Sequence, residues 1–253
     1  MSTPDAYASI AELYAAEHDD WDYDLPLYAH LAERVGGPIL DLACGTARVG
    51  TALAAAGFEV HGVDASPALL AIARRRAEER GLEVELEQGD MRRLSSRVRF
   101  GAVFCALDSF LHLASMQDQL DTLEGVSGVL EPGGILCVDV FNPTLDRLAA
   151  WDGVLRTQGS FRDAEGTAVT HFVSWVVDPG TQRIDALHTY DSLSADGHVQ
   201  RRVSRMPLRY VHRFELELAL RCAGFDRIET YGTWALDPFD GEGDRLIAVA
   251  TKL

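Results

Sequence analysis

Three short polar segments of this chain have the residue types that bind a nucleoside. The loop Asp41–Thr46 directly follows an apolar run, Asp64 ends the next apolar run, and Gly89–Met91 follows a third. Gly45 permits a tight turn and a close approach of the backbone to a ligand. Thr46 is expected to cap the next helix, whose N–H groups favour an anionic group such as a carboxylate. A carboxylate at the Asp64 position suits a bidentate grip on two ribose hydroxyls.

The third segment completes the nucleoside interpretation. The Asp90 carboxylate can accept a hydrogen bond from an exocyclic amine, and Met91 can pack against an adenine ring. For the three segments to reach one ligand, the runs that precede them must end at the same edge of one sheet.

The first half of the chain has the pattern that brings those ends together. Short apolar runs alternate with amphipathic helical stretches, and Ser66–Pro67 opens one helix with a good N-cap and a proline in the first turn. Such alternation implies right-handed crossovers and a parallel, doubly wound sheet, in which ligands bind beyond the carboxyl ends of the strands. Strands are expected at Ile39–Leu42, Phe58–Val63, Val84–Glu87, Gly101–Ala106 and Ile135–Val140, helices near 47–56, 67–80 and 116–130, and a helix stop and turn at Glu131–Gly134.

The pattern changes in the second half. Between about Thr157 and Tyr210 the chain has β-like runs separated by turns, and a helix and two further strands follow. We therefore expect an α/β fold in which a doubly wound sheet carries an inserted antiparallel β subdomain. The expected parts are an N-terminal helical lid at 1–34, a cofactor-binding core at 35–153 and 211–253, and an insertion at 154–210. The expected elements are strands Val169–Val177, Arg183–Leu193 and His198–Leu208, helix Phe214–Ala223, and strands Phe225–Thr230 and Arg245–Thr251.

Charge and composition argue against several classes of function. The formal net charge is −16, and Lys252 is the only lysine among the 23 basic residues. Because so acidic a surface repels the phosphate backbone at long range, a small molecule is the expected partner rather than a nucleic acid. No apolar run reaches the roughly 18–20 residues needed to span a bilayer, and the N-terminus has no signal-peptide pattern. We expect a cytoplasmic protein with no membrane partner, and its four scattered cysteines favour buried thiols over a metal site.

A dinucleotide-binding oxidoreductase is the nearest alternative for the first half. Its fingerprint is G-x-G-x-x-G, in which the second glycine lets a pyrophosphate approach. The loop here has Gly45 alone from that set, with Ala43 and Ala47 beside it. An acid at Asp64 fits either interpretation, so the loop is what disfavours a pyrophosphate.

Four segments in the same order resemble the motifs of class I S-adenosylmethionine-dependent methyltransferases. They are Asp41–Thr46, Gly62–Ser66, Gly89–Met91 and Leu130–Gly134, and the similarity covers about residues 35–140. The resemblance implies a seven-stranded sheet with the last strand antiparallel and S-adenosylmethionine as the cofactor. The sequence departs from the family at Ala47, where many members carry the last glycine of the loop. The cofactor-binding residues implied are Asp41, Ala43, Gly45, Thr46, Asp64, Ala65, Asp90, Met91 and Ala106.

More narrowly, the chain resembles the small-molecule branch that includes the amino-sugar N-methyltransferases. Ile10–Tyr14 and Cys105–His112 carry this similarity, together with the β insertion. It implies that the N-terminal helix closes over the cofactor and that Tyr14 faces the methionine end. It does not extend to the identity of the methyl acceptor.

The acceptor is expected between the N-terminal segment, the loop after the fourth strand and the insertion. His112 in that loop is the candidate to take a proton from the acceptor or to orient it, since an ordinary pKa near 6.5 suits such work at neutral pH. The alternative is a histidine packed at a helix start without a chemical role. Asp108 is expected to stabilise a cationic amine or to border the sulfonium rather than to act as a base. Further acceptor contacts are expected from Tyr7, Trp21, Phe141, Asn142 and Tyr210.

The sequence thus predicts methyl transfer to nitrogen or oxygen of a small metabolite. An in-line displacement needs alignment of the two reactants and no metal. Two rivals remain: an RNA or protein methyltransferase, and an NAD-type nucleotide-binding domain. A homodimer formed through the insertion is compatible with the sequence, which contains no direct sign of it.

Overall fold

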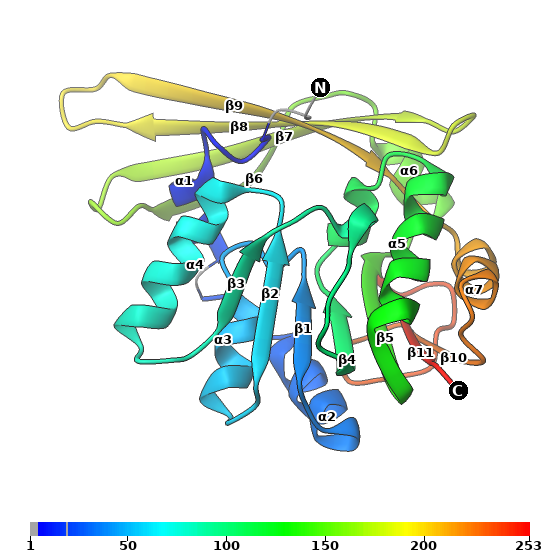
Figure 1. Cartoon of the computed structure of the whole chain (residues 1–253). Coiled ribbons are helices and arrows are strands. Elements are labelled where there is room, and N and C mark those ends of the chain that lie inside the picture. Colours follow the sequence, from blue (N-terminus) through cyan, green and yellow to red (C-terminus); the bar gives the residue numbers. More distant parts are fainter. Residues whose placement is uncertain (1–4, 19) are drawn as a thin grey trace.

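In the computed structural model, which describes residues 5–18 and 20–253, the chain folds into two sheets (Figure 1). The larger sheet contains seven strands: β1 (Ile39–Leu42), β2 (Val60–Asp64), β3 (Glu85–Gln88), β4 (Phe100–Cys105), β5 (Leu130–Phe141), β10 (Arg227–Tyr231) and β11 (Arg245–Thr251). Their order is β10-β11-β5-β4-β1-β2-β3. β11 pairs antiparallel with both of its neighbours, and the other pairings are parallel. This confirms the α/β fold class and the antiparallel last strand.

Helices cover both faces of the larger sheet, as buried parallel strands require. Side chains of α2 (Leu25–Val35) and α3 (Arg48–Ala55) belong to the hydrophobic cluster on one face. Those of α5 (Met116–Val129) and α7 (Arg213–Cys222) belong to the cluster on the other face. Because successive residues of a strand point to opposite faces, the interior strand β1 contributes to both clusters.

Local signals begin and end these elements. α4 (Pro67–Glu79) begins at Ser66, whose Oγ accepts a hydrogen bond from the Leu69 N–H at 3.2 Å, as predicted. The prediction of a turn at Glu131–Gly134 is wrong. β5 begins at Leu130, directly after α5, and the segment is an irregularity within that strand where its register against β4 shifts.

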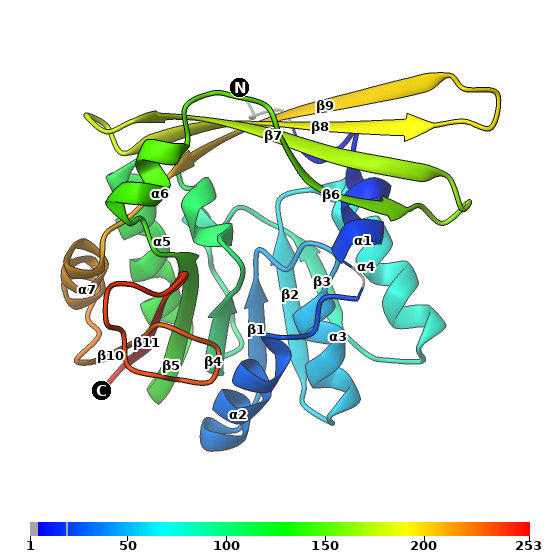
Figure 2. The same ribbon diagram turned by 180° about the vertical axis from the view of Figure 1, so that it is seen from behind.

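The second sheet is antiparallel and lies across the carboxyl ends of the parallel strands (Figures 1 and 2). Its strands, in spatial order, are β6 (Arg156–Arg162), β7 (Ala168–Asp178), β8 (Arg183–Leu193) and β9 (Val199–Arg209). β6 has no counterpart among the individually predicted strands. The sheet therefore closes the edge at which the sequence places the ligand-binding segments.

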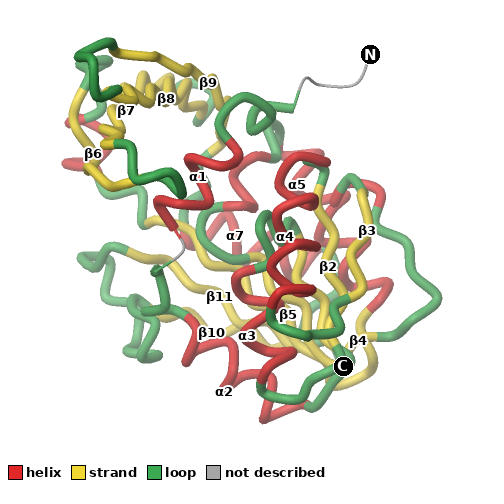
Figure 3. The backbone as a smooth tube through the Cα atoms, turned by 90° about the vertical axis from the view of Figure 1, so that its left-hand side faces the viewer, coloured by secondary structure: helices red, strands yellow, loops and turns green. Residues whose placement is uncertain are grey.

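The two N-terminal helices lie in different places (Figure 3). α1 (Ala11–His18) packs between the second sheet and α4: Leu13 joins a cluster with Ala186 of β8, and Ala15 joins one with Leu69 of α4. α2 instead packs on one face of the larger sheet, against α3 and β4. Of the segment expected as a lid, residues 1–4 and 19 lie outside the described part.

Three short elements complete the chain. They are two turns of 3-10 helix, η1 (Met91–Arg93) and η2 (Ser109–His112), and α6 (Leu145–Ala150). Within residues 5–18 and 20–253, every helix is too short or too polar to cross a bilayer.

Candidate active site

A cavity of about 330 Å³ lies at the carboxyl edge of the larger sheet, where the second sheet and the N-terminal segment meet it. All three predicted nucleoside-binding segments contribute to its wall, as does the loop after β4. Its volume is at the small end of the range for ligand sites. The predicted residues that line it are Tyr7, Tyr14, Ala43, Gly45, Asp64, Ala65, Asp90, Met91 and His112.

Asp64 ends β2 and is held by backbone N–H groups. One carboxylate oxygen accepts a hydrogen bond from the Gly45 N–H at 2.8 Å, and the other accepts one from the Ser66 N–H at 2.7 Å. Burial raises the pKa of Asp64, and these two N–H groups oppose that rise. Since an ionised carboxylate has about four acceptor sites, lone pairs remain for ligand hydroxyls. The carboxylate is thus oriented before any ligand binds.

The loop after β1 turns sharply through three residues in the left-handed region. Ala43, Gly45 and Ala47 have φ values of 57°, 55° and 54°. Glycine adopts this conformation without cost, whereas a residue with a Cβ does not. The irregularity at Ala47 noted in the sequence is therefore a backbone position that favours glycine.

Two residues of this loop lie away from the cavity wall. Asp41 is buried beneath α3, where its carboxylate accepts a hydrogen bond from the Gly50 N–H at 2.9 Å. Thr46 does not cap α3, contrary to the prediction, because the N-cap position is taken by Ala47. Its hydroxyl instead accepts a hydrogen bond from Arg76 at 3.1 Å.

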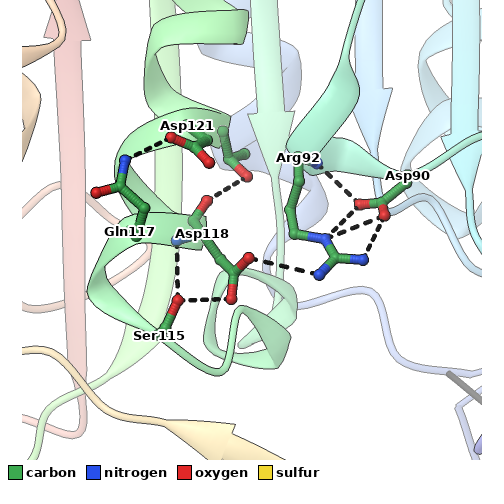
Figure 4. A network of polar contacts seen from close by, with 7 residues as sticks. Asp90, Arg92, Ser115, Gln117, Asp118 and Asp121 are labelled. Carbon is green, nitrogen blue, oxygen red and sulfur yellow. Dashed lines mark hydrogen bonds and ion pairs between the residues drawn. The ribbon is translucent and has the colours of Figure 1, made fainter. Parts of the chain in front are cut away.

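The Asp90 carboxylate is already paired (Figure 4). The Arg92 Nε donates to both carboxylate oxygens at 2.9 and 3.0 Å, and its terminal nitrogen reaches Asp118 of α5 at 3.4 Å. The hydrogen bonds from Arg92 hold the pKa of Asp90 below its ordinary value. All three side chains line the cavity. The pair is half exposed, so exchange of one of its hydrogen bonds for a ligand amine costs little.

Tyr7, Tyr14 and His112 form an aromatic group at the same cavity. The Tyr7 hydroxyl lies 3.2 Å from His112 Nε2, and the Tyr7 ring meets that of Tyr14 edge to face at 5.1 Å. Burial raises the pKa of Tyr14 to about 12 and also raises that of Tyr7, while burial lowers the pKa of His112. All three are therefore neutral near pH 7. Either the Tyr7 hydroxyl or the Nε2–H tautomer of a neutral His112 can then donate the hydrogen bond between them.

Asp108, by contrast, belongs to a structural cluster. Its carboxylate accepts a hydrogen bond from the Phe141 N–H at 2.6 Å and lies 3.3 Å from Arg245, which also pairs with the fully buried Asp139 at 2.7 Å. Asp108 is not among the cavity-lining residues. The structure thus places it where it joins the ends of β4, β5 and β11.

The other predicted contacts also lie outside the cavity wall. The Asn142 amide donates to the carbonyls of Gly241 and Gly243, and the Phe141 ring packs on Trp151. The Trp21 ring packs on Trp234, and Tyr210 is buried beside His212. Ala106 directly follows β4 but does not reach the cavity.

The sequence patterns did not point to several lining residues. Arg92 lies two positions after Asp90, so its proximity to a recognised segment was an available signal. Asp5 and Met206 had no such signal, because they are about 200 positions apart and only packing brings both to the wall of one cavity. The Asp5 carboxylate accepts a hydrogen bond from the Ser66 hydroxyl at 2.8 Å, which fastens the N-terminal segment to the start of α4.

The charge of the wall decides which nucleoside fits. Asp5, Asp64, Asp90 and Asp118 line the cavity, and the arginine on its wall, Arg92, is paired with two of them. These carboxylates would repel a pyrophosphate, whereas a cationic sulfonium nucleoside with ribose hydroxyls and an adenine amine complements them. The residues present therefore fit S-adenosylmethionine and disfavour a dinucleotide.

Known proteins resemble this chain along most of its length. Residues 39–134 match the family model described as a methyltransferase domain. The glycine/sarcosine N-methyltransferase of Halorhodospira halochloris is 30% identical over 233 residues, covering 88% of this chain and 78% of that protein. The dTDP-3-amino-3,6-dideoxy-alpha-D-glucopyranose N,N-dimethyltransferase of Streptomyces fradiae is 31% identical over 202 residues, covering 73% and 78%. A shorter match, to YqeM of Bacillus subtilis (strain 168), is 38% identical over 140 residues and spans 55% of that protein.

A solved structure extends the similarity to the whole fold. The CcbJ methyltransferase from Streptomyces caelestis superposes with a TM-score of 0.80 at 27% identity, and the match covers 100% of both chains. Sequence and fold agree with the acidic cavity at the carboxyl edge of the sheet. The chain belongs to the class I S-adenosylmethionine-dependent methyltransferases.

Proposed function

We propose that this enzyme transfers a methyl group to an amine nitrogen of a small metabolite. The observation that carries the proposal is the single cavity between the two sheets, which is lined both by Asp64 and by the Tyr7–His112 pair. A cavity of about 330 Å³ leaves little room beside the cofactor, so a small acceptor suits it better than a folded macromolecule.

The relatives support nitrogen over oxygen. Two relatives, of each of which this chain covers 78%, are named for N-methylation, one of glycine and sarcosine and the other of an amino sugar. S-adenosylmethionine, when bound, supplies a methyl group on a sulfonium that an amine lone pair can displace in line. The task of the protein is then to align that lone pair and to exclude water, which can supply about 7–11 kcal/mol of the barrier.

Each residue of the proposed site has one role. Asp64 holds the ribose hydroxyls, and Asp90 with Met91 holds the adenine. Tyr14 borders the methionine end. His112, neutral and hydrogen-bonded to Tyr7, orients the acceptor. The expected roles of Asp41, Thr46, Ala106, Asp108, Trp21, Phe141, Asn142 and Tyr210 are not needed for this assignment.

Labelled-methyl transfer tests the proposal. The full chain is incubated with methyl-labelled S-adenosylmethionine and glycine, sarcosine or glucosamine, with glucose as a matched control that has a hydroxyl in place of the amine. We expect label in one or more of the amines and none in glucose. Label found only in added RNA or folded protein would overturn the small-molecule assignment. Calorimetry in which NAD binds and S-adenosylmethionine does not would overturn the cofactor roles of Asp64 and Asp90.

A further inference from the structure

A chain of hydrogen bonds joins α1 to the second sheet outside the predicted site. The Glu17 carboxylate lies 2.8 Å from His171 Nδ1, and His171 Nε2 lies 3.0 Å from His188 Nδ1. The other Glu17 oxygen accepts a hydrogen bond from the Tyr190 hydroxyl at 2.8 Å, and the His171 ring stacks on Tyr190 with centroids 4.2 Å apart. Glu17 comes from α1, His171 from β7, and His188 and Tyr190 from β8.

The carboxylate at one end determines where the imidazole protons lie. An ionised carboxylate only accepts hydrogen bonds, so His171 must carry its proton on Nδ1. A neutral His171 then offers a lone pair at Nε2, and His188 must donate from its own Nδ1. His188 is left with an unprotonated Nε2 on the other side of its ring. The chain thus fixes a tautomer that presents a lone pair.

That lone pair is accessible. Within the described part of the chain, the buried side-chain nitrogens without a well-formed hydrogen bond belong to Trp21 and Arg245. His188 Nε2 is not among them although no described residue hydrogen-bonds it, so this atom keeps some solvent contact on a side chain that is only partly exposed. A histidine that only held α1 against the sheet would not need an unbonded lone pair on its second ring nitrogen.

The sheet register places His188 beside the wall of the cavity. His188 lies opposite Ser204 of β9, whose hydroxyl donates to the Ala6 carbonyl at 2.5 Å. Met206 is two residues further along the same strand, and Ala6 and Met206 both line the cavity. Diagonal neighbours on one face of an antiparallel pair lie about 7–8 Å apart. His188 therefore adjoins Ser204, which contacts the wall residue Ala6, and lies diagonally across from the wall residue Met206, without itself lining the cavity.

We propose that His188 receives an N–H of the methyl acceptor at its Nε2 atom, and that Glu17 acts through His171 as a positioning residue that keeps this atom unprotonated. The proposal rests on the amine-methylating function proposed above. It adds a hydrogen-bond acceptor from the second sheet to the aromatic group of Tyr7 and His112.

The charges around the chain agree with this role. Burial raises the pKa of Glu17, but hydrogen bonds from His171 and Tyr190 help to hold it below its ordinary value. Burial lowers the pKa of His188 to about 4, with His171, His112 and His18 adding to the effect and Glu17 opposing it. Near pH 7, His188 is therefore neutral, and the tautomer that the chain assigns to it makes Nε2 an acceptor.

A neutral hydrogen-bond acceptor at His188 Nε2 favours methyl transfer to the amine. As the new N–CH₃ bond forms and the S–CH₃ bond breaks, its electron pair goes to sulfur and positive charge develops on the acceptor nitrogen. The N–H groups of that nitrogen become stronger donors as this happens, so a hydrogen bond to His188 Nε2 tightens in the transition state. The Glu17 carboxylate at the far end of the chain offsets the positive charge.

One variant and a control test the expected effect of His188 on turnover, using whichever amine the wild type methylates. We expect His188→Ala to lower kcat by about 100-fold or more while the S-adenosylmethionine Kd stays near that of the wild type. Free imidazole in the assay should restore part of the lost rate, which it would not do for a purely structural defect. The control is His198→Ala, because His198 lies in the β8–β9 turn with 86% of its side chain exposed. It should leave kcat unchanged.

Nitrogen-15 NMR tests the proton positions without any acceptor. In the wild type at neutral pH, His171 and His188 should each show a protonated Nδ1 and an unprotonated Nε2. Glu17→Gln should allow both tautomers, because an amide donates as well as accepts, and its kcat should fall between those of the wild type and His188→Ala.

The outcomes separate this inference from the proposed function. A protonated Nε2 on wild-type His188, or a His188→Ala enzyme with near wild-type kcat, overturns the inference while amine methylation stands. A wild-type enzyme that labels no amine overturns both.

Discussion

The two sides of the cavity are built by different means. On the side of the larger sheet, Asp64 and the loop around Gly45 belong to short contiguous segments and are oriented by backbone N–H groups. On the side of the second sheet, the Tyr7–His112 pair of the cavity wall joins the N-terminal segment to η2. The Glu17–His171–His188 chain, whose members do not line the cavity, joins α1 to β7 and β8. The first side depends on the local path of the chain and the second on its tertiary packing.

This difference has a chemical basis. The cofactor is the same throughout the family, so one turn geometry and one carboxylate at each strand end are sufficient for its recognition. An acceptor differs from enzyme to enzyme, and loops and added sheets are the parts of a fold that can change without disturbing the core. We therefore expect substitutions on the cofactor side to alter stability or cofactor affinity, and substitutions on the acceptor side to alter turnover.

The largest effect is expected at Asp41, beneath the cofactor loop. Burial raises the pKa of Asp41 to about 7 from an ordinary 3.8, with the Gly50 N–H and Arg48 opposing the rise. The folded state thus keeps a proton that the unfolded state loses, so this group lowers stability as the pH rises from about 4 to about 7. Asp41→Asn removes the ionisation and keeps an acceptor for Gly50.

The free energy of unfolding of Asp41→Asn, relative to the wild type, should increase by up to about 4 kcal/mol between about pH 4 and about pH 8. Urea unfolding of both proteins at each pH measures this difference. Two stability profiles that run parallel over this range would mean that Asp41 is ionised in the folded protein.

A smaller effect is expected at Asp64 and should appear in cofactor affinity. Loss of a hydrogen bond to a charged group costs about 1.5–3 kcal/mol, so Asp64→Ala should weaken S-adenosylmethionine binding by about 10- to 150-fold. Calorimetry gives the Kd directly. Asp121→Ala is the matched control, since this exposed carboxylate on α5 is bonded to Gln117 (Figure 4). Equal Kd values for the two variants would contradict the ribose role.

On the acceptor side, Tyr7→Phe should act on turnover instead. The substitution removes the hydroxyl that is hydrogen-bonded to His112 Nε2 and keeps the ring that packs on Tyr14. Loss of one neutral hydrogen bond costs about 0.5–1.5 kcal/mol, so kcat should fall by about 2- to 12-fold. Steady-state kinetics with S-adenosylmethionine as the varied substrate separates kcat from KM. Tyr23→Phe, at a side chain with 69% exposure, should change neither quantity. A change in KM alone would place Tyr7 on the cofactor side.

The smallest effect is expected at Ala47 and concerns the loop backbone. A left-handed conformation costs a residue with a Cβ about 1–2 kcal/mol, and a glycine at this position would remove that cost. Glycine also raises the entropy of the unfolded chain, which cancels about 0.5–1 kcal/mol of the stabilisation. Ala47→Gly should therefore raise the free energy of unfolding by up to about 1 kcal/mol. Ala52→Gly in the interior of α3 should lower it by about 1 kcal/mol. Destabilisation by both substitutions would mean that Ala47 is not strained.

The parts that could be predicted share one property. β1, β8 and β11 have the bounds expected from the sequence, and α4 begins at Ser66 as predicted, because apolar periodicity and capping residues act over a few positions. The cavity likewise includes Gly45, Asp64 and Asp90, since parallel strands bring their carboxyl ends to one edge. Signals that extend over a few residues are readable without a structure.

The parts that could not be predicted depend on longer distances. Nothing in the local sequence indicated that Asp108 would pair with Arg245. The sequence also did not indicate that α1 packs against β8, and so it did not indicate the contact between Glu17 and His171. Each is decided by which surfaces pack together after the elements form.

The sequence by itself therefore determined the α/β class and the edge of the sheet at which the cavity lies, while the antiparallel last strand was implied by the resemblance to the family. It did so because periodicity, turn residues and strand-end carboxylates are local properties. The tertiary structure alone decided that the second sheet covers that edge, that Asp108 joins structural elements rather than the cavity, and that Glu17, His171 and His188 form one chain. The physical reason is that the direction of a side chain's hydrogen bonds is set by partners more than 100 residues away, and only packing brings those partners within reach.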